Sequence, residues 1–296
     1  MGASAIRTEF VEAPGGRQLR VEIGGAGSRV VLCHLGSPNA GVLYEPWVRD
    51  ASGRDLLLVT YDRPGYGEST PLPGRTVADC ADDVRAIARA VGFDRCAVWG
   101  WSGGGPCALA CAALLGDLVA AVATVGSPAP IMEMGEEFFV GAADSMREDL
   151  ALYDRDRAEW ERSNQAQWEQ LMGLTADDLR AAWSEHAVPA DRDALQGEFG
   201  RWLHRVLRQG LEPGGEGWSE DDIATFHAPW GFDPADIRMP VKVWHGTDDT
   251  FVPCGQGRWL AQRIPGAEVD IRDGDGHMRV MAERVGEVHG WLAEHV

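Results

Sequence analysis

Five short apolar runs, separated by segments of helical periodicity, most constrain how this chain can fold. The runs lack the alternation of a half-exposed strand, so they suit strands that are covered on both faces; they span residues 30–33, 56–61, 96–99, 119–125 and 241–244. Between two of them, Thr76 can cap a helix whose apolar stripe runs to Val91 and which ends at Gly92. Alternating strands and helices predict a doubly wound α/β fold around a mostly parallel sheet.

Two further segments predict the edges of this sheet. Residues 18–23 alternate between polar and apolar side chains, which is typical of an antiparallel strand with one exposed face. We expect this strand to form a hairpin with residues 6–11. Residues 268–272 are expected to form the last strand, ahead of a C-terminal helix.

The alternation stops after Pro130 and resumes near Met239, which predicts three parts: a first core segment over 1–130, a mainly helical insertion over 131–236, and a second core segment over 237–296. The insertion contains 24 Asp and Glu residues against nine Arg, so it holds most of the chain's net charge of −19. Such a charge run usually marks a solvated helical surface. The alternative is an entrance field that disfavours anionic substrates and tolerates cationic ones.

Length and composition exclude several classes of protein. The chain has 296 residues and 45% hydrophobic content, enough for a sizeable core. No apolar run approaches the roughly 18 residues of a membrane helix, and Arg7 and Glu9 lie where a secretory leader would be apolar, so we expect no membrane association and a cytoplasmic location. The negative charge and the single lysine, Lys242, argue against a nucleic-acid partner. The six cysteines lack metal-ligand spacing, so we expect no metal. We also expect no cofactor and a small-molecule substrate as partner. The oligomeric state stays open.

The segment Gly100-Trp101-Ser102-Gly103-Gly104 places a serine between glycines, where the run over 96–99 meets an alanine-rich helical segment. A nucleophile on such a sharp turn needs very small residues two positions away on either side, because the strand and helix backbones crowd together there. Pro106 fits the first turn of the helix, where a missing N–H costs no hydrogen bond. A motif this short also arises by chance, so it needs a matching base and acid.

Serine attacks efficiently only when a base takes its proton and an acid orients that base. Of the eight histidines, His277 is the candidate base, because it lies in a glycine-rich loop between the strand over 268–272 and the C-terminal helix. The candidate acids are Asp248 and Asp249, which follow the strand over 241–244. The residues alone do not separate these two aspartates.

Three further loops carry a resemblance to a known family. Residues 34–38 (His-Leu-Gly-Ser-Pro) are similar to its H-x-G-x-P loop, residues 62–69 to its D-x-R-G-x-G-x-S turn, and residues 245–253 to its H-G-x-x-D-x-x-V-P segment. With the chain order Ser, Asp, His, the sequence resembles the lid-bearing α/β-hydrolases, which include esterases, peptidases and haloperoxidase-like enzymes. The resemblance implies a mostly parallel eight-stranded sheet flanked by helices, with a helical lid inserted, and its register selects Asp249 as the acid.

The same resemblance implies an oxyanion hole made of two backbone N–H groups. One belongs to Gly103, after the nucleophile, and the other to Ser37, with Gly36 matching the glycine of the motif. We expect Gly36 to contact the substrate. Trp101, beside the nucleophile, and Trp230, near the return of the insertion to the core, are further candidates for lining the substrate pocket.

The expected activity is that of a serine hydrolase that cleaves an ester, thioester, lactone or amide, with Ser102 as nucleophile, His277 as base and Asp249 as the orienting acid. Three alternatives stay open. The first is a proline-iminopeptidase-like aminopeptidase, whose acidic insertion holds the ammonium group of the substrate. The second is an acyltransferase or cyclising enzyme, and the third is a ligand-binding protein that keeps the fold without turnover.

Overall fold

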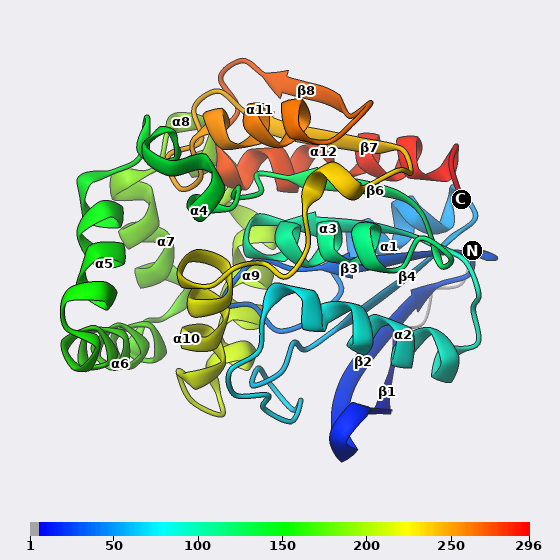
Figure 1. Ribbon diagram of the computed structural model, residues 1–296, viewed down its shortest axis with the longest axis horizontal. Coiled ribbons are helices and arrows are strands. Elements are labelled where there is room, and N and C mark those ends of the chain that lie inside the picture. The colour runs from blue at the N-terminus through cyan, green and yellow to red at the C-terminus, as the bar shows by residue number, and fades with distance from the viewer. Residues whose placement is uncertain (1–5) are drawn as a thin grey trace.

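An eight-stranded, mostly parallel sheet forms the centre of the molecule (Figure 1). The structure is a computed structural model that describes residues 6–296, without the side chains of residues 184–186. The strand order is β1-β2-β4-β3-β5-β6-β7-β8. The strands are β1 (Ile6–Ala13), β2 (Arg17–Gly25), β3 (Arg29–His34), β4 (Leu56–Tyr61), β5 (Cys96–Trp101), β6 (Val119–Val125), β7 (Val241–Gly246) and β8 (Glu268–Arg272).

The edge formed by β1 and β2 is the antiparallel part of this sheet. β1 pairs with β2 as the predicted hairpin, and β2 runs antiparallel to β4, while the other neighbours are parallel. The α/β prediction and the predicted eight-stranded sheet are therefore confirmed. The expectation about a secretory leader, drawn from residues 1–11, lies partly outside the described residues.

Helices cover both faces of the sheet, and the side chains of the central strands divide between two cores. Leu32 packs with helices α2 (Cys80–Val91), α3 (Gly105–Leu114) and α11 (Cys254–Arg263) on one face. Its neighbours Val31 and Cys33 pack with α1 (Glu45–Ser52) and α12 (His277–Ala293) on the other. Strands buried on both faces explain the continuous apolar runs in the sequence.

The helix expected after Thr76 begins with a tighter turn than predicted. Val77–Asp79 form a 3-10 turn closed by a capping box between Thr76 and Asp79, and α2 continues from Cys80. The helix ends at Gly92, whose φ of 88° lies in the left-handed region. The periodicity therefore predicted the extent of the helix correctly, and the capping box explains where it starts.

Between β6 and β7 the described chain forms helices and no strand. All of these helices lie within the insertion predicted over 131–236, and its role as a lid stays a prediction. Residues 212–215 interrupt the helices, and the chain is helical again from Glu216. The elements are α4 (Ile131–Met134), α5 (Asp144–Arg155), α6 (Arg157–Gly173), α7 (Ala176–His186), α8 (Pro189–Ala194), α9 (Gly197–Leu211), α10 (Glu216–Asp222) and a π-helical turn over Ile223–His227.

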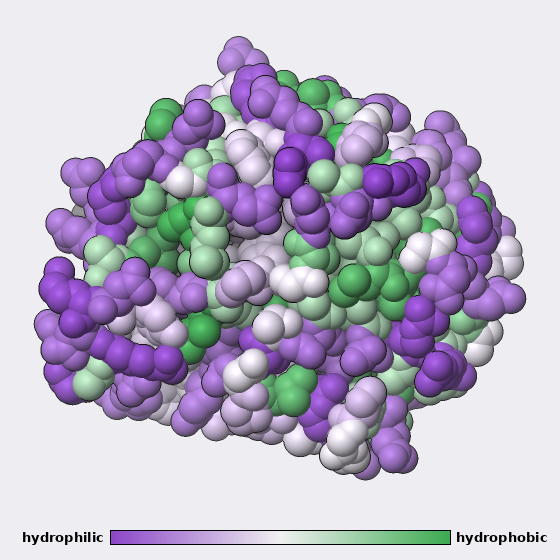
Figure 2. Space-filling model, in the orientation of Figure 1, coloured by the Kyte–Doolittle hydropathy of each residue, from purple (hydrophilic) through white to green (hydrophobic). Residues whose placement is uncertain are grey.

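Among residues 6–296, no helix is both long and apolar enough to cross a membrane. The six cysteines are free thiols; five are buried and Cys254 is half-buried. Hydrophilic residues cover much of the face in Figure 2, with hydrophobic residues exposed between them.

Candidate active site

Ser102 lies on the turn between β5 and α3, in a backbone conformation that is rare for a residue with a side chain. Its φ is 52°, in the left-handed region. A Cβ atom at Gly100 would overlap the backbone of Gly104, and one at Gly104 would overlap the carbonyl group of His34. Both glycines are therefore required by backbone contacts, as the elbow motif predicts.

His277 and Asp249 form a hydrogen bond in the interior of the molecule. The Nδ1 atom of His277 lies 2.8 Å from Oδ2 of Asp249, and both residues are buried. The other oxygen of Asp249 accepts hydrogen bonds from the N–H groups of Phe251 at 3.0 Å and Val252 at 2.7 Å. Asp248 is exposed and accepts a hydrogen bond from the hydroxyl of Thr247 at 2.9 Å. The structure thus brings Asp249, and not Asp248, to the histidine.

The position of His277 differs slightly from the sequence prediction. It is the first residue of α12 and does not lie in the loop before the helix. Its ring lies against those of Trp101 and Phe251, with centroids 5.6 and 5.3 Å away. Two aromatic side chains and the helix start therefore restrict the orientation of the imidazole.

Asp249 and His277 each stabilise the charged form of the other. Burial opposes ionisation of Asp249, but the charge of His277 and hydrogen bonds with His245 and His277 outweigh it and hold the pKa of this carboxyl well below its usual range. Burial lowers the pKa of His277, yet the charge and hydrogen bond of Asp249, together with Asp191, raise it overall above the ordinary value. Asp249 is thus a carboxylate at neutral pH and favours a proton on the imidazole.

The loop after β3 lies against the serine turn. A Cβ atom at Gly36 would lie 2.9 Å from Cβ of Ser102, and one at Gly103 would lie 3.2 Å from the backbone nitrogen of Ser37. Gly36, Ser37 and Gly103 therefore lie close to one another beside Ser102, and their role as an oxyanion hole stays a prediction.

A buried ionic network, which the sequence did not reveal, anchors this loop. Asp221, from α10, accepts hydrogen bonds at Oδ2 from the hydroxyls of Ser37 and Tyr66, each at 2.7 Å, and from Nη2 of Arg63 at 2.6 Å. Its Oδ1 atom lies 2.5 Å from Nη1 of Arg75. Arg63 also donates to the carbonyl oxygen of Leu35. Arg63 stands at the variable second position of the D-x-R-G-x-G-x-S turn, where the motif has no required residue, so the motif did not predict this network.

Ser102 and His277 open onto one pocket of about 1140 Å³. Gly36, Ser37, Gly103 and Trp101 also line it, in agreement with their predicted positions. The remaining wall comes largely from the insertion and is rich in aromatic and acidic side chains, including Asp149, Glu159, Trp160, Trp218 and Asp222.

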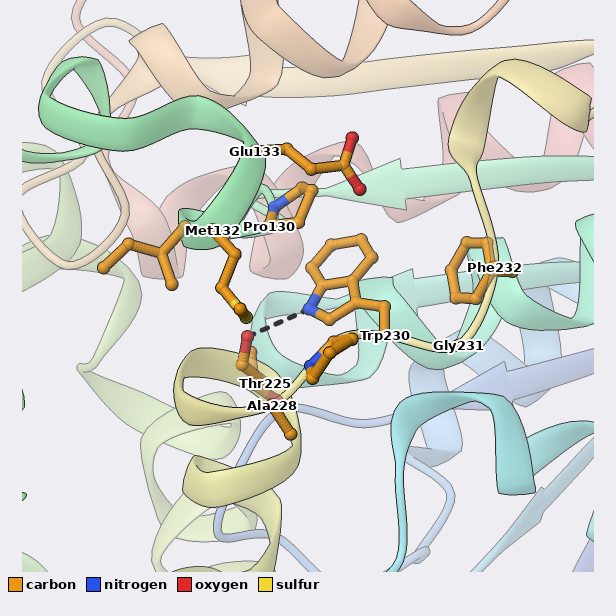
Figure 3. A pocket seen from close by; sticks show the side chains of 10 residues that line it. Pro130, Met132, Glu133, Thr225, Ala228, Trp230, Gly231 and Phe232 are labelled. Atoms are coloured by element: carbon orange, nitrogen blue, oxygen red, sulfur yellow. Dashed lines mark hydrogen bonds between the residues drawn. The ribbon is translucent and has the colours of Figure 1, made fainter.

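The structure does not support the prediction that Trp230 lines this pocket. Trp230 lines a separate cavity of about 240 Å³ and donates from Nε1 to the carbonyl oxygen of Thr225 at 2.9 Å (Figure 3). Its side chain is only 3% exposed and packs with the core that includes α2 and α3. Trp230 belongs to the insertion, shortly before the chain returns to β7, and it does not line the pocket that contains Ser102.

Comparison with known proteins identifies the family. The model of the alpha/beta hydrolase fold matches residues 29–282. The chain belongs to this family. The hydrolase is 28% identical to the pimeloyl-[acyl-carrier protein] methyl ester esterase of Chromobacterium violaceum over 251 residues, which cover 84% of this chain and 87% of the esterase.

Two further relatives extend the comparison. Polyketide synthase ThaQ of Burkholderia thailandensis is 26% identical over 277 residues, which are 92% of this chain and 12% of the synthase, so the hydrolase spans about an eighth of that relative. Among solved structures, an alpha/beta hydrolase fold protein from Nakamurella multipartita superimposes with a TM-score of 0.66 at 26% identity, covering 97% of this chain and 98% of its own. The hydrolase is therefore an enzyme of the alpha/beta hydrolase fold.

We expect Asp221→Asn to destabilise the enzyme strongly, because it leaves Arg63 and Arg75 buried without their counter-charge. The free energy of unfolding should fall by about 3–5 kcal/mol, measured by urea denaturation. Asp117→Asn is the matched control, since Asp117 bonds Arg85 at 2.9 and 3.0 Å but is exposed. The control should unfold like the wild type. Equal effects of the two substitutions would contradict the proposed anchoring.

Proposed function

We propose that the enzyme is a serine hydrolase that cleaves an ester, thioester, lactone or amide of a small molecule through an acyl-enzyme. The observation that carries this proposal is the buried hydrogen bond of 2.8 Å between His277 and Asp249, beside a pocket that also contains the positive-φ Ser102. A nucleophile, a base and an orienting acid at one pocket are the parts that acyl transfer requires.

In the proposed reaction, the Oγ atom of Ser102 attacks the carbonyl carbon of the substrate while Nε2 of His277 takes the hydroxyl proton. Asp249 holds Nδ1 and stabilises the imidazolium that forms. The carbonyl oxygen becomes an oxyanion, which the backbone N–H groups of Ser37 and Gly103 stabilise. His277 then gives its proton to the leaving group, the tetrahedral intermediate collapses to the acyl-enzyme, and water activated by His277 releases the acid and regenerates Ser102.

One relative supports an ester as the scissile bond, because it carries the name of a methyl ester esterase. If an acceptor other than water reaches the acyl-enzyme, the same site performs acyl transfer or ring closure. The inserted helices enclose much of the pocket, so we propose that they act as a lid that controls this access.

We expect a fluorophosphonate probe to label the wild-type enzyme in a 1:1 ratio, because an activated serine attacks the phosphorus and displaces fluoride. Ser102→Ala should abolish labelling without loss of folding, followed by intact-protein mass spectrometry and circular dichroism. Ser145→Ala is the control, since Ser145 lines the same pocket but lies outside the turn. A folded wild type that resists the probe would favour a ligand-binding protein instead.

Exchanging the acid tests the assignment of Asp249. Asp249→Asn should lower kcat for p-nitrophenyl butyrate by about 10³- to 10⁴-fold, because the amide cannot stabilise the imidazolium. Asp248→Asn, at the exposed neighbour, should leave kcat unchanged. The opposite ranking would show that the acid had been assigned to the wrong aspartate.

The charge of the pocket favours a second candidate, an aminopeptidase of the proline-iminopeptidase type. Glu148, Asp149, Glu159 and Asp222 line the pocket together with Arg155. Burial raises the pKa of Asp149 and holds that of Asp222 well above its usual range, and the carboxyl groups that are ionised attract an ammonium group. We expect an aminopeptidase to hydrolyse proline p-nitroanilide and to reject its N-acetylated form, measured by release of nitroaniline. Equal rates on both compounds, or on neither while p-nitrophenyl esters are cleaved, would eliminate this candidate.

A further inference from the structure

Asp191 is a fully buried carboxylate that the insertion places against the start of α12. It lies in α8 and has no exposed surface. Helix α8 packs against α12, as Figure 1 shows. The residues that Asp191 contacts, Gly276, Met278 and Arg279, flank His277 on both sides. A residue of the insertion thus reaches the one turn of helix that carries the proposed base.

The first contribution of Asp191 is that of a helix cap. The first N–H groups of a helix need acceptors from outside it, and a side chain at the N-cap position usually supplies one. In α12 the N-cap residue is Gly276, which has no side chain to offer. Oδ1 of Asp191 accepts instead from the N–H groups of Met278 and Arg279, each at 2.9 Å.

Gly276 explains why this cap comes from another helix. A Cβ atom at position 276 would overlap the carboxylate of Asp191. The φ of Gly276 is −98°, which any residue adopts, so the backbone does not require glycine here. Glycine at position 276 leaves room for the carboxylate of Asp191, so the helix cap depends on both residues.

The second contribution of Asp191 is its negative charge. Burial raises the pKa of this carboxyl, while the N–H groups of Met278 and Arg279 and the charge of His277 act in the opposite direction and favour the charged form. The charged groups that act on His277 are Asp249, from the loop after β7, and Asp191, from α8. Nε2 of His245 lies 3.4 Å from Oδ2 of Asp249, the oxygen that also bonds His277, and Arg279 pairs with Asp275 and Glu283. Among the described residues, Oδ2 of Asp191 has no hydrogen-bond partner, so this oxygen is not neutralised by a donor.

We propose that Asp191 is a positioning residue for His277: it fixes the start of the helix that presents the imidazole, and it adds a second buried carboxylate that stabilises the imidazolium formed during attack. This role rests on the proposed function. It extends the site beyond the three residues of the triad and makes the insertion a part of the catalytic apparatus as well as a cover for the pocket.

Asp191→Asn separates the two contributions, because the amide oxygen still caps the helix while the charge is lost. We expect kcat for p-nitrophenyl butyrate to fall about 10-fold, with a melting temperature close to that of the wild type. The base must be neutral to act, and loss of a carboxylate makes its proton easier to remove. The acid limb of the pH profile of kcat/KM should therefore move about half a pH unit lower.

Two further variants serve as a control and as an independent test of this proposal. Asp193→Asn removes an exposed carboxylate from the same helix and should change neither kcat nor the pH profile. Gly276→Ala keeps the carboxylate but displaces it from the helix start, so it should lower kcat and shift the acid limb even if Asp191→Asn fails to fold. Wild-type kcat and an unshifted acid limb in folded Asp191→Asn would overturn the proposal.

A readout that needs no turnover distinguishes failure of this proposal from failure of the proposed function. The imidazole of His277 can be titrated by NMR, with the resonance assigned by its loss in His277→Gln. We expect the pKa of His277 to be lower in Asp191→Asn than in the wild type. If the wild type neither cleaves esters nor reacts with the fluorophosphonate, the hydrolase proposal fails, while an unchanged pKa of His277 in folded Asp191→Asn overturns the role of Asp191.

Discussion

The close approach of three backbone segments around Ser102 is the constraint on which the rest of the site depends. The turn after β5, the start of α3 and the loop after β3 meet where a Cβ atom at Gly100 or Gly104 would overlap a neighbouring backbone. A Cβ atom at Gly105 would likewise overlap the side chain of Ser127, in the loop after β6. Because these elements touch through backbone atoms, Ser102 has little freedom to move relative to the loop of Ser37. An oxyanion hole benefits from this rigidity, since its donors then need no rearrangement during the reaction.

Two buried carboxylates from the insertion hold two segments of the site, the loop of Ser37 and the start of α12. Asp221 binds the hydroxyl of Ser37 and the guanidinium of Arg63, next to the proposed oxyanion donor. Asp191 binds the start of the helix that presents His277. Each carboxylate is buried and each bonds donors from the core of the fold, so movement of these parts of the insertion would break hydrogen bonds within the interior. Any lid motion that admits substrate is therefore expected in helices that carry neither aspartate, such as α5 and α6.

The sequence predicted the fold well because the relevant signals are local. Continuous apolar runs follow from strands buried on both faces, and the hairpin of β1 and β2 follows from alternation on an exposed edge. The glycines around Ser102 signal backbone contact, and the pair of His277 with Asp249 follows the order of motifs. Asp191 and Asp221 could not be found this way, because their partners lie far away in the sequence and both belong to a strongly acidic segment. The sequence was misleading for Trp230 for a similar reason. A position near the return of the chain to the core does not determine which cavity the indole lines.

The acidic residues of the insertion are of two kinds, surface carboxylates and buried carboxylates, which the amino-acid composition does not distinguish. Most of its carboxylates lie at or near the surface, where water and salt screen them and each contributes little. Asp191 and Asp221 are buried, and each is held by donors that oppose the cost of removing a charge from water. For Asp221 the surrounding charges and donors outweigh burial and lower the pKa of the carboxyl, whereas for Asp191 burial outweighs them and raises it. For Asp221 these donors are two guanidinium groups and two hydroxyls, and for Asp191 they are the N–H groups at a helix start. In the proposed function, charge at the surface attracts or repels approaching substrates, whereas these two charges hold the proposed base and oxyanion donor in position relative to Ser102. High salt should therefore weaken the first effect and leave the second intact.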